Sequence, residues 1–74
     1  MISPVRVLIV DDSAYIRRIL GSTLRSSAGI EVVGEAADGD SALNLVRRLN
    51  PDVVTLDLDL PGEDGLRILA AIQE

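Results

Sequence analysis

Three aspartates at the ends of apolar segments are the residues of this sequence best suited to chemistry. Asp11 and Asp12 directly follow the apolar run 5–10, and Asp57 lies in a second apolar run, 53–58. Oxygen ligands without nitrogen or sulfur favour Mg²⁺, which binds through a few carboxylates together with waters and phosphate oxygens. If the two runs are neighbouring strands, the three carboxylates need a shared cation, because they would otherwise repel one another.

Asp57 is also the candidate reactive group. A carboxylate is rarely placed in an apolar strand without a partner. An aspartate is ionised at neutral pH and can attack phosphorus without a general base, which gives an aspartyl phosphate. A bound cation would neutralise the charge on the phosphoryl oxygens during the transfer. We therefore predict that Asp57 accepts a phosphoryl group beside a Mg²⁺ site lined by Asp11 and Asp12.

Simpler interpretations of the same acids have to be weighed. Asp12 could serve only as the cap of the helix that follows it. Asp57 alone could be a structural acid with satisfied hydrogen bonds. Asp59 and Asp64 lie in a turn-rich segment, where aspartate is common because its side chain bonds the local backbone. Two adjacent acids exceed what a cap needs, and their pairing with Asp57 favours the metal site.

The composition narrows the chemistry further. The chain has 74 residues, enough for one domain at most, and Tyr15 is its only aromatic residue, so the core is expected to be aliphatic. It has no cysteine and no histidine, which excludes disulfides, a zinc site of the usual ligands, and a cysteine or histidine nucleophile. The net charge is −5 and the seven cations are scattered arginines, which argues against nucleic-acid binding. The longest apolar run is too short to cross a membrane and no apolar leader follows Met1, so we expect a cytoplasmic protein without a membrane partner.

The sequence alternates strand patterns with helical patterns, which predicts an α/β fold with a parallel sheet. Strands are expected at 5–10, 30–36 and 53–58, and helices at 14–25, from Asp38 or Asp40 to Asn50, and from 66 to 72. The first strand has the most continuous apolar pattern, so we place it at the centre, with strand order 2-1-3.

Charged residues within these elements suggest which surfaces face solvent. Strict alternation places Glu31 and Glu35 on one face of the second strand, which suits an edge position. The pairs Arg17-Arg18 and Arg47-Arg48 are most simply exposed helix faces. The third strand is as apolar as the first, although nothing in the sequence would cover its outer edge. Either further strands belong beside it or two copies pair there, so a non-catalytic, self-associating fragment remains a second hypothesis.

Two motifs carry a family resemblance. The strand followed by Asp11-Asp12-Ser13, together with Asp57 followed by the Pro-Gly-Glu-Asp-Gly segment 61–65, resembles the receiver domains of two-component response regulators. Segments 10–14 and 51–57 look most like the receiver half of chemotaxis protein-glutamate methylesterases. The resemblance implies a flavodoxin-like fold, of which residues 1–74 would be the amino-terminal part of a single receiver domain, truncated to three of five strand–helix units.

The resemblance also implies roles for individual residues. Asp57 would receive the phosphoryl group from a histidine kinase, and Asp11 and Asp12 would bind Mg²⁺ directly or through water. Asp59 would give its backbone carbonyl to the metal, and Pro61 and Gly65 match the loop after the acceptor strand. This sequence has no lysine and lacks the region of the family's hydroxyl residue, so we expect metal binding without a complete switch. Any methylesterase activity would lie outside this chain, which is therefore expected not to be an enzyme.

A third hypothesis comes from a different enzyme class. Asp57-Leu58-Asp59 resembles the nucleophile motif of haloacid-dehalogenase-like phosphatases. In that family the motif ends the first strand, whereas here it follows the third. The hypothesis also leaves Asp11 and Asp12 unexplained, and the receiver resemblance is therefore preferred.

Overall fold

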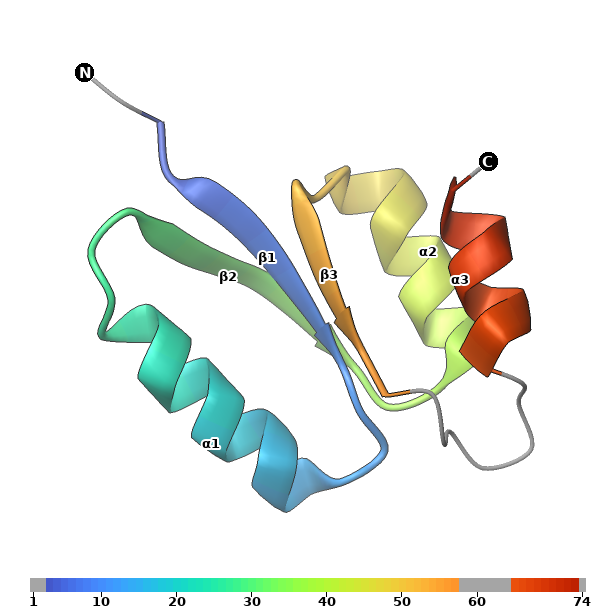
Figure 1. Ribbon diagram of the computed structural model, residues 1–74, viewed down its shortest axis with the longest axis horizontal. Coiled ribbons are helices and arrows are strands. Elements are labelled where there is room, and N and C mark those ends of the chain that lie inside the picture. Colours follow the sequence, from blue (N-terminus) through green and yellow to red (C-terminus); the bar gives the residue numbers. More distant parts are fainter. Residues whose placement is uncertain (1–2, 58–64, 74) are drawn as a thin grey trace.

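A three-stranded parallel sheet lies at the centre of the molecule, and helices cover both of its faces (Figure 1). The computed structural model describes residues 3–57 and 65–73. Helix α1 lies on one face of the sheet, and α2 and α3 lie side by side on the other. The elements are β1 (Val5–Val10), α1 (Ala14–Arg25), β2 (Ile30–Ala36), α2 (Gly39–Leu49), β3 (Val53–Leu56) and α3 (Gly65–Gln73). The sheet order β2-β1-β3 confirms the predicted strand order.

The central strand β1 provides most of the buried core. Its residues Val7, Leu8, Ile9 and Val10 are at most 4% exposed. Leu8 and Val10 pack with Ala36 of β2 and Ala42 of α2, so they face the α2 side of the sheet. Because side chains alternate along a strand, Val7 and Ile9 face the α1 side. An aliphatic core centred on the first strand is therefore confirmed.

A bulge in β2 corrects one expectation. Val7 pairs with Val32 but Leu8 pairs with Gly34, so Val33 is skipped and the alternation shifts. Glu31, opposite Arg6, is consequently on the α2 side, and Glu35 is on the α1 side. The prediction that both glutamates share one face was wrong, because it assumed an unbroken period of two.

The structure shows which of the predicted residues cap the helices. Ser13 caps α1, since its Oγ accepts the Ile16 N–H at 3.2 Å, so Asp12 is not the cap. Asp38 rather than Asp40 caps α2, and its Oδ1 accepts the Ser41 N–H at 2.8 Å. Asn50 ends α2 in the left-handed region with φ 48°, a conformation that asparagine tolerates better than most residues.

Two further expectations need correction. Strand β3 ends at Leu56 instead of reaching 58, because its ladder partner β1 ends at Val10; Leu58 lies outside the described residues. Arg17 is not simply exposed: its side chain is 20% exposed and pairs with Glu35, whereas Arg18, Arg47 and Arg48 are exposed as predicted.

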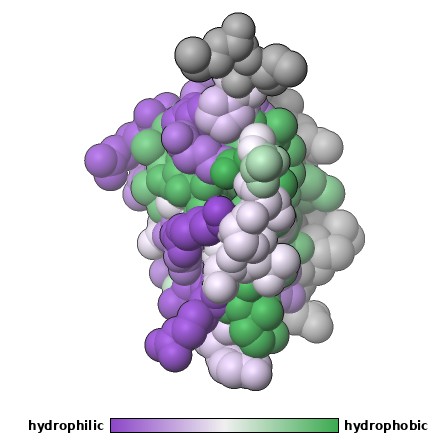
Figure 2. Space-filling model, turned by 90° about the vertical axis from the view of Figure 1, so that its left-hand side faces the viewer, coloured by the Kyte–Doolittle hydropathy of each residue, from purple (hydrophilic) through white to green (hydrophobic). Residues whose placement is uncertain are grey.

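Among the described residues, no helix is both long enough and apolar enough to cross a lipid bilayer. Hydrophobic surface is nevertheless exposed beside hydrophilic groups on the face that Figure 2 presents. The exposed large apolar side chains include Ile16 and Ile19 of α1 and Val53 of β3.

Candidate metal centre

The structure brings the three predicted acids together. Asp11 and Asp12 follow β1, and Asp57 follows the neighbouring parallel strand β3. Val10 pairs with Leu56 at the ends of these strands, so the next residues, Asp11 and Asp57, leave the sheet at the same edge. One carboxylate oxygen from each acid lies within 4.8 Å of the other two. The expected proximity of these carboxylates is therefore observed.

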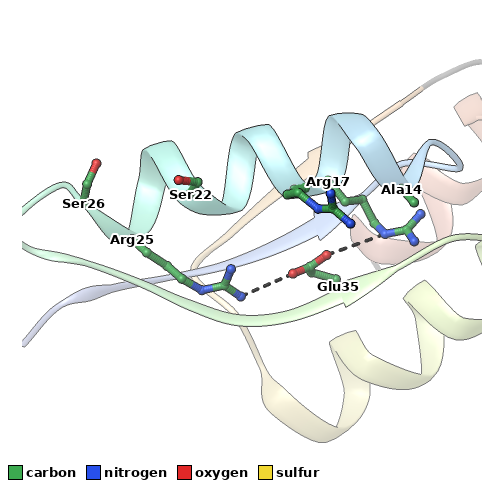
Figure 3. Close-up of a pocket in the computed structure, with 7 residues that line it drawn as sticks. Ala14, Arg17, Ser22, Arg25, Ser26 and Glu35 are labelled. Carbon is green, nitrogen blue, oxygen red and sulfur yellow. Dashed lines mark hydrogen bonds and ion pairs between the residues drawn. The ribbon is translucent and has the colours of Figure 1, made fainter.

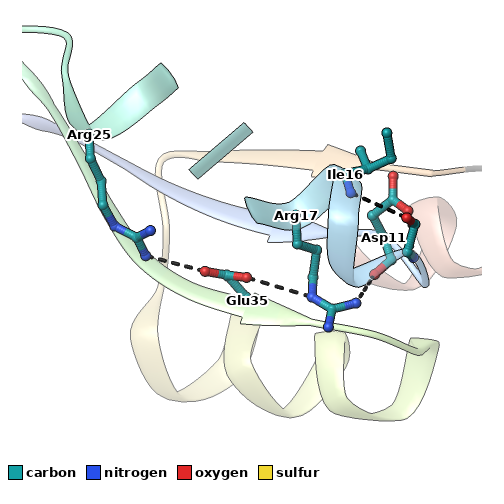
Figure 4. A network of polar contacts seen from close by, with 6 residues as sticks. Asp11, Ile16, Arg17, Arg25 and Glu35 are labelled. Atoms are coloured by element: carbon teal, nitrogen blue, oxygen red, sulfur yellow. Dashed lines mark hydrogen bonds and ion pairs between the residues drawn. The ribbon is translucent and has the colours of Figure 1, made fainter. Parts of the chain in front are cut away.

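Both backbone polar groups of Asp11 and one of its carboxylate oxygens form hydrogen bonds. Its N–H donates to the Ala36 carbonyl of β2 at 3.0 Å. Its carbonyl accepts a hydrogen bond from Arg17 Nη1 at 2.6 Å (Figure 4). Its Oδ1 accepts the Ser13 N–H at 2.9 Å. Among the described residues nothing donates to Oδ2 of Asp11, so this oxygen is available to a cation.

Asp12 and Asp57 differ in exposure. Asp12 is exposed and makes no hydrogen bond or ion pair with the part of the chain that is described. Asp57 is half-buried, and its N–H donates to the Val10 carbonyl at 3.0 Å, which fixes its backbone against β1. One side of the cluster is thus accessible to water, and the other is held by the sheet.

The donor set fits a hard divalent cation. All three groups are carboxylates, and within residues 3–57 and 65–73 neither Asp11 nor Asp12 has a cationic partner for its carboxylate. Mg²⁺ combines a small number of carboxylates with several retained waters, which suits a half-exposed cluster. Asp59 and Pro61, also expected at this site, lie outside the described residues, and Gly65 begins α3.

Sequence analysis missed the role of Arg17. The available signal was Glu35, a carboxylate on a partly covered strand, since such a group requires a cationic or hydrogen-bonding partner. Glu35 binds two arginines of α1: Arg17 Nε lies 3.6 Å from Oε1, and Arg25 Nη2 lies 3.3 Å from Oε2 (Figure 4). The same Arg17 reaches the Asp11 carbonyl, so this ion-pair network extends to the acidic cluster.

Comparison with known proteins assigns the class. Residues 7–74 match the family described as "Response regulator receiver domain", and the chain belongs to this family. The chain is similar to the "response regulator domain of Thermotoga maritima CheB", with a TM-score of 0.90 and 40% identity over 95% of this chain and 52% of that one. The fold is thus the flavodoxin-like receiver fold. The strand order β2-β1-β3 agrees with this assignment.

The curated relatives point to a particular group within the class. The chain is 56% identical over 72 residues to "Protein-glutamate methylesterase/protein-glutamine glutaminase 5" of Myxococcus xanthus, covering 97% of this chain and 21% of the relative. A relative from Geobacter metallireducens is 54% identical over 70 residues, covering 95% and 20%. This confirms the predicted similarity to the receiver portion of chemotaxis methylesterases. The chain spans about a fifth of these relatives, and a receiver domain is not itself the catalytic region.

A second similar solved structure is a complex that contains Mg²⁺. The crystal structure of the "CheX-CheY-BeF3-Mg+2 complex" from Borrelia burgdorferi aligns with a TM-score of 0.83 and 37% identity, covering 96% of this chain and 54% of that one. The chain thus spans about half of the similar solved structures. Its membership in the receiver family supports a role as a phosphoacceptor in two-component signalling.

Proposed function

We propose that this chain accepts a phosphoryl group from a histidine kinase on Asp57, with Mg²⁺ held by Asp11, Asp12 and Asp57. The Asp59 backbone carbonyl would complete the protein ligands. The observation that carries the proposal is the convergence of three carboxylate oxygens within 4.8 Å at the ends of β1 and β3. The magnesium in the similar Borrelia complex supports the choice of metal.

Each residue of the site has its own role in the phosphoryl transfer. An Asp57 carboxylate oxygen attacks the phosphorus, so an O–P bond forms as the N–P bond to the kinase histidine breaks. When bound, Mg²⁺ supplies positive charge that neutralises the phosphoryl oxygens. The backbone hydrogen bond from Asp57 to Val10 keeps the nucleophile beside β1. Asp11 and Asp12 hold negative oxygens at the opposite side of the cluster, where a shared cation relieves their repulsion.

Phosphorylation with a small donor tests the proposal without the kinase. The protein is incubated with acetyl phosphate and Mg²⁺, and its intact mass is measured. We expect the mass of one phosphoryl group to appear, to disappear in Asp57→Asn, and to fall strongly in Asp12→Asn. Asp40→Asn is the matched control, because it removes the same charge from an exposed position at the start of α2. Modification that persists in Asp57→Asn would refute the proposal.

The wider context is part of the same proposal. We propose that residues 1–74 are the amino-terminal part of a single receiver domain in a cytoplasmic chemotaxis regulator. The relatives supporting this are methylesterases, and any esterase activity would belong to a region outside the matched part. The match to the receiver family weighs against the phosphatase hypothesis, and Asp59, the second acid of that motif, lies outside the described residues.

Self-association through β3 is a second candidate function. In the described residues β3 pairs only with β1, and Val53 on this strand is 45% exposed. An unpaired apolar edge can pair with another chain. Light scattering over a range of protein concentrations tests this candidate: a concentration-dependent dimer that is weakened by Val53→Lys would support it, and a constant monomer would exclude it.

A further inference from the structure

We propose that Arg17 is a positioning residue for the metal site: Glu35 orients its guanidinium, which fixes the peptide joining Asp11 to Asp12. The inference rests on the proposed Mg²⁺ site. Arg17 would act through the two aspartates, without touching the cation itself. The proposal adds two residues, one on α1 and one on β2, to a site otherwise built from strand ends.

The contact between Arg17 and the acidic loop is direct. Arg17 Nη1 donates to the Asp11 carbonyl at 2.6 Å, a charge-assisted hydrogen bond (Figure 4). That carbonyl belongs to the peptide group between Asp11 and Asp12. Because a peptide group is planar, holding its oxygen restricts the rotation of both residues. One guanidinium can therefore set the direction of two neighbouring carboxylates.

Glu35 is in turn well placed to hold Arg17. It lies opposite Ile9, so it faces α1. Its two carboxylate oxygens form ion pairs with Arg17 and Arg25 (Figure 3). Gly21, buried between these arginines on α1, provides the room. A Cβ at Gly21 would lie 2.7 Å from Arg25 Nη1 and 3.7 Å from Glu35 Oε2. A glycine inside a helix is unfavourable for stability. At position 21 it permits the guanidinium of Arg25 to lie against the helix.

The loop has few other restraints. Asp11 is also held by its N–H bond to Ala36 and by the Ser13 N–H bond to Oδ1. Neither bond fixes the Asp11 carbonyl. Without Arg17, this peptide loses its only hydrogen bond from the described residues and can rotate, which moves Oδ2 of Asp11 and the whole Asp12 side chain relative to Asp57.

If Arg17 acted only through its charge, removing it would change the Mg²⁺ affinity in the opposite direction. The direction of the change in affinity therefore tests the inference. A cation near a Mg²⁺ site repels the metal, so removing an arginine that acts only through its charge strengthens Mg²⁺ binding. Arg18 provides the matched case. It is adjacent to Arg17 on the same helix and exposed, and its side chain makes no hydrogen bond or ion pair with the described residues. Only a positioning role makes the loss of a nearby cation weaken binding.

The test is calorimetric titration of the apo protein and its variants with Mg²⁺. We expect Arg17→Gln to weaken Mg²⁺ binding about tenfold, a usual loss when an outer hydrogen bond to a metal ligand is removed. Arg18→Gln is expected to leave the affinity unchanged or slightly higher. Arg17→Lys retains the charge but cannot reproduce the fork to Asp11 and Glu35, so it should also bind more weakly. Hydrogen exchange at the Ser13 amide should become faster in Arg17→Gln.

The outcomes separate the two proposals. If Arg17→Gln binds Mg²⁺ as tightly as Arg18→Gln, the positioning role is overturned and the metal site stands. If the wild-type protein does not bind Mg²⁺, the proposed function fails and the inference fails with it. Should Arg17→Gln not fold, Arg17→Lys decides: wild-type affinity in that variant overturns the positioning role, and weaker binding supports it.

Discussion

Helices α1 and α2, which lie on opposite faces of the sheet, differ in how they are held to it. On the α2 side, Leu8, Val10 and Ala42 are buried in one apolar cluster. On the α1 side, Ile16 and Ile19 remain 39% and 43% exposed. The contacts between α1 and β2 include the ion pairs of Glu35. Both helices have similar apolar periodicity in the sequence, so periodicity alone does not reveal which face supplies stability and which supports the site.

Two glycines illustrate the same difference. A Cβ at Gly34 of β2 would lie 3.1 Å from Leu49 and 3.3 Å from Leu8, so this glycine lets apolar side chains approach the strand. Gly21 of α1 instead makes room for the guanidinium of Arg25. The α2 side is packed by leucines, and the α1 side is held partly by charge. We expect substitutions in the apolar cluster beside α2 to change stability, and substitutions in the ion pairs of Glu35 on the α1 side to change the acidic loop.

The largest effect is expected from the apolar side. Leu8→Ala removes a fully buried side chain and should lower the free energy of unfolding by about 2–5 kcal/mol. Ile19→Ala, on the α1 side, should lower it by about 1 kcal/mol or less, because that side chain is 43% exposed. Urea denaturation followed by circular dichroism measures both. Equal losses would contradict the difference in packing between these two side chains.

Substitutions of the two glycines should change the stability of the protein in opposite directions. Gly34→Val places methyl groups where leucines already lie, so we expect a loss of about 1–3 kcal/mol. Gly21→Ala improves helix propensity by about 1 kcal/mol. It should displace only the flexible end of Arg25, so stability should remain unchanged or rise. Thermal unfolding compares the two variants. A stabilised Gly34→Val protein, or a strongly destabilised Gly21→Ala protein, would argue against these packing assignments.

A substitution at the N-cap of α1 should change the stability of the protein without changing its Mg²⁺ affinity. Ser13→Ala removes the side chain that accepts the Ile16 N–H and should lower stability by about 1 kcal/mol. The Ser13 backbone N–H still donates to Asp11 Oδ1, so Mg²⁺ affinity should not change. Ser22→Ala, at an exposed position in the same helix, is the control and should not destabilise. Chemical denaturation and Mg²⁺ titration together test this prediction, and a parallel loss of affinity would contradict it.

The smallest effect concerns pH at the α2 cap. The hydrogen bonds from the Ser41 backbone and hydroxyl lower the pKa of Asp38 from its ordinary value of 3.8. Because the folded pKa is lowered, the stabilisation is present above the unfolded value and is lost as pH falls through the folded one. The melting temperature of the wild type should therefore drop more steeply below about pH 4 than that of Asp38→Asn, which retains a capping side chain. Parallel curves for the two proteins would contradict the cap assignment.

Much of the fold was predictable because local signals agreed with one another. The predicted bounds of β1, α1 and β2 match the structure, since apolar patterns and caps mark the same positions. The strand order followed from the apolar continuity of β1. The family and the convergence of Asp11, Asp12 and Asp57 were also predicted, because neighbouring parallel strands end at one edge.

What sequence analysis missed depends on register and docking. The bulge at Val33 moves Glu35 to the α1 side, and no local pattern shows which residue a bulge will skip. The link from Glu35 through Arg17 to Asp11 then requires the position of α1 over the sheet. Similarly, β3 ends where its partner strand ends, a limit set by pairing and not by the apolar run itself.

The central claim is that Asp11, Asp12 and Asp57 share one divalent cation. A titration of isotopically labelled protein with Mg²⁺, followed by amide NMR, tests it most directly. We expect saturable shifts with one-site behaviour at residues 11–13 and 57, little change near Arg25, and loss of the response in Asp12→Asn and Asp57→Asn. Shifts that do not saturate, or wild-type binding by both variants, would contradict it.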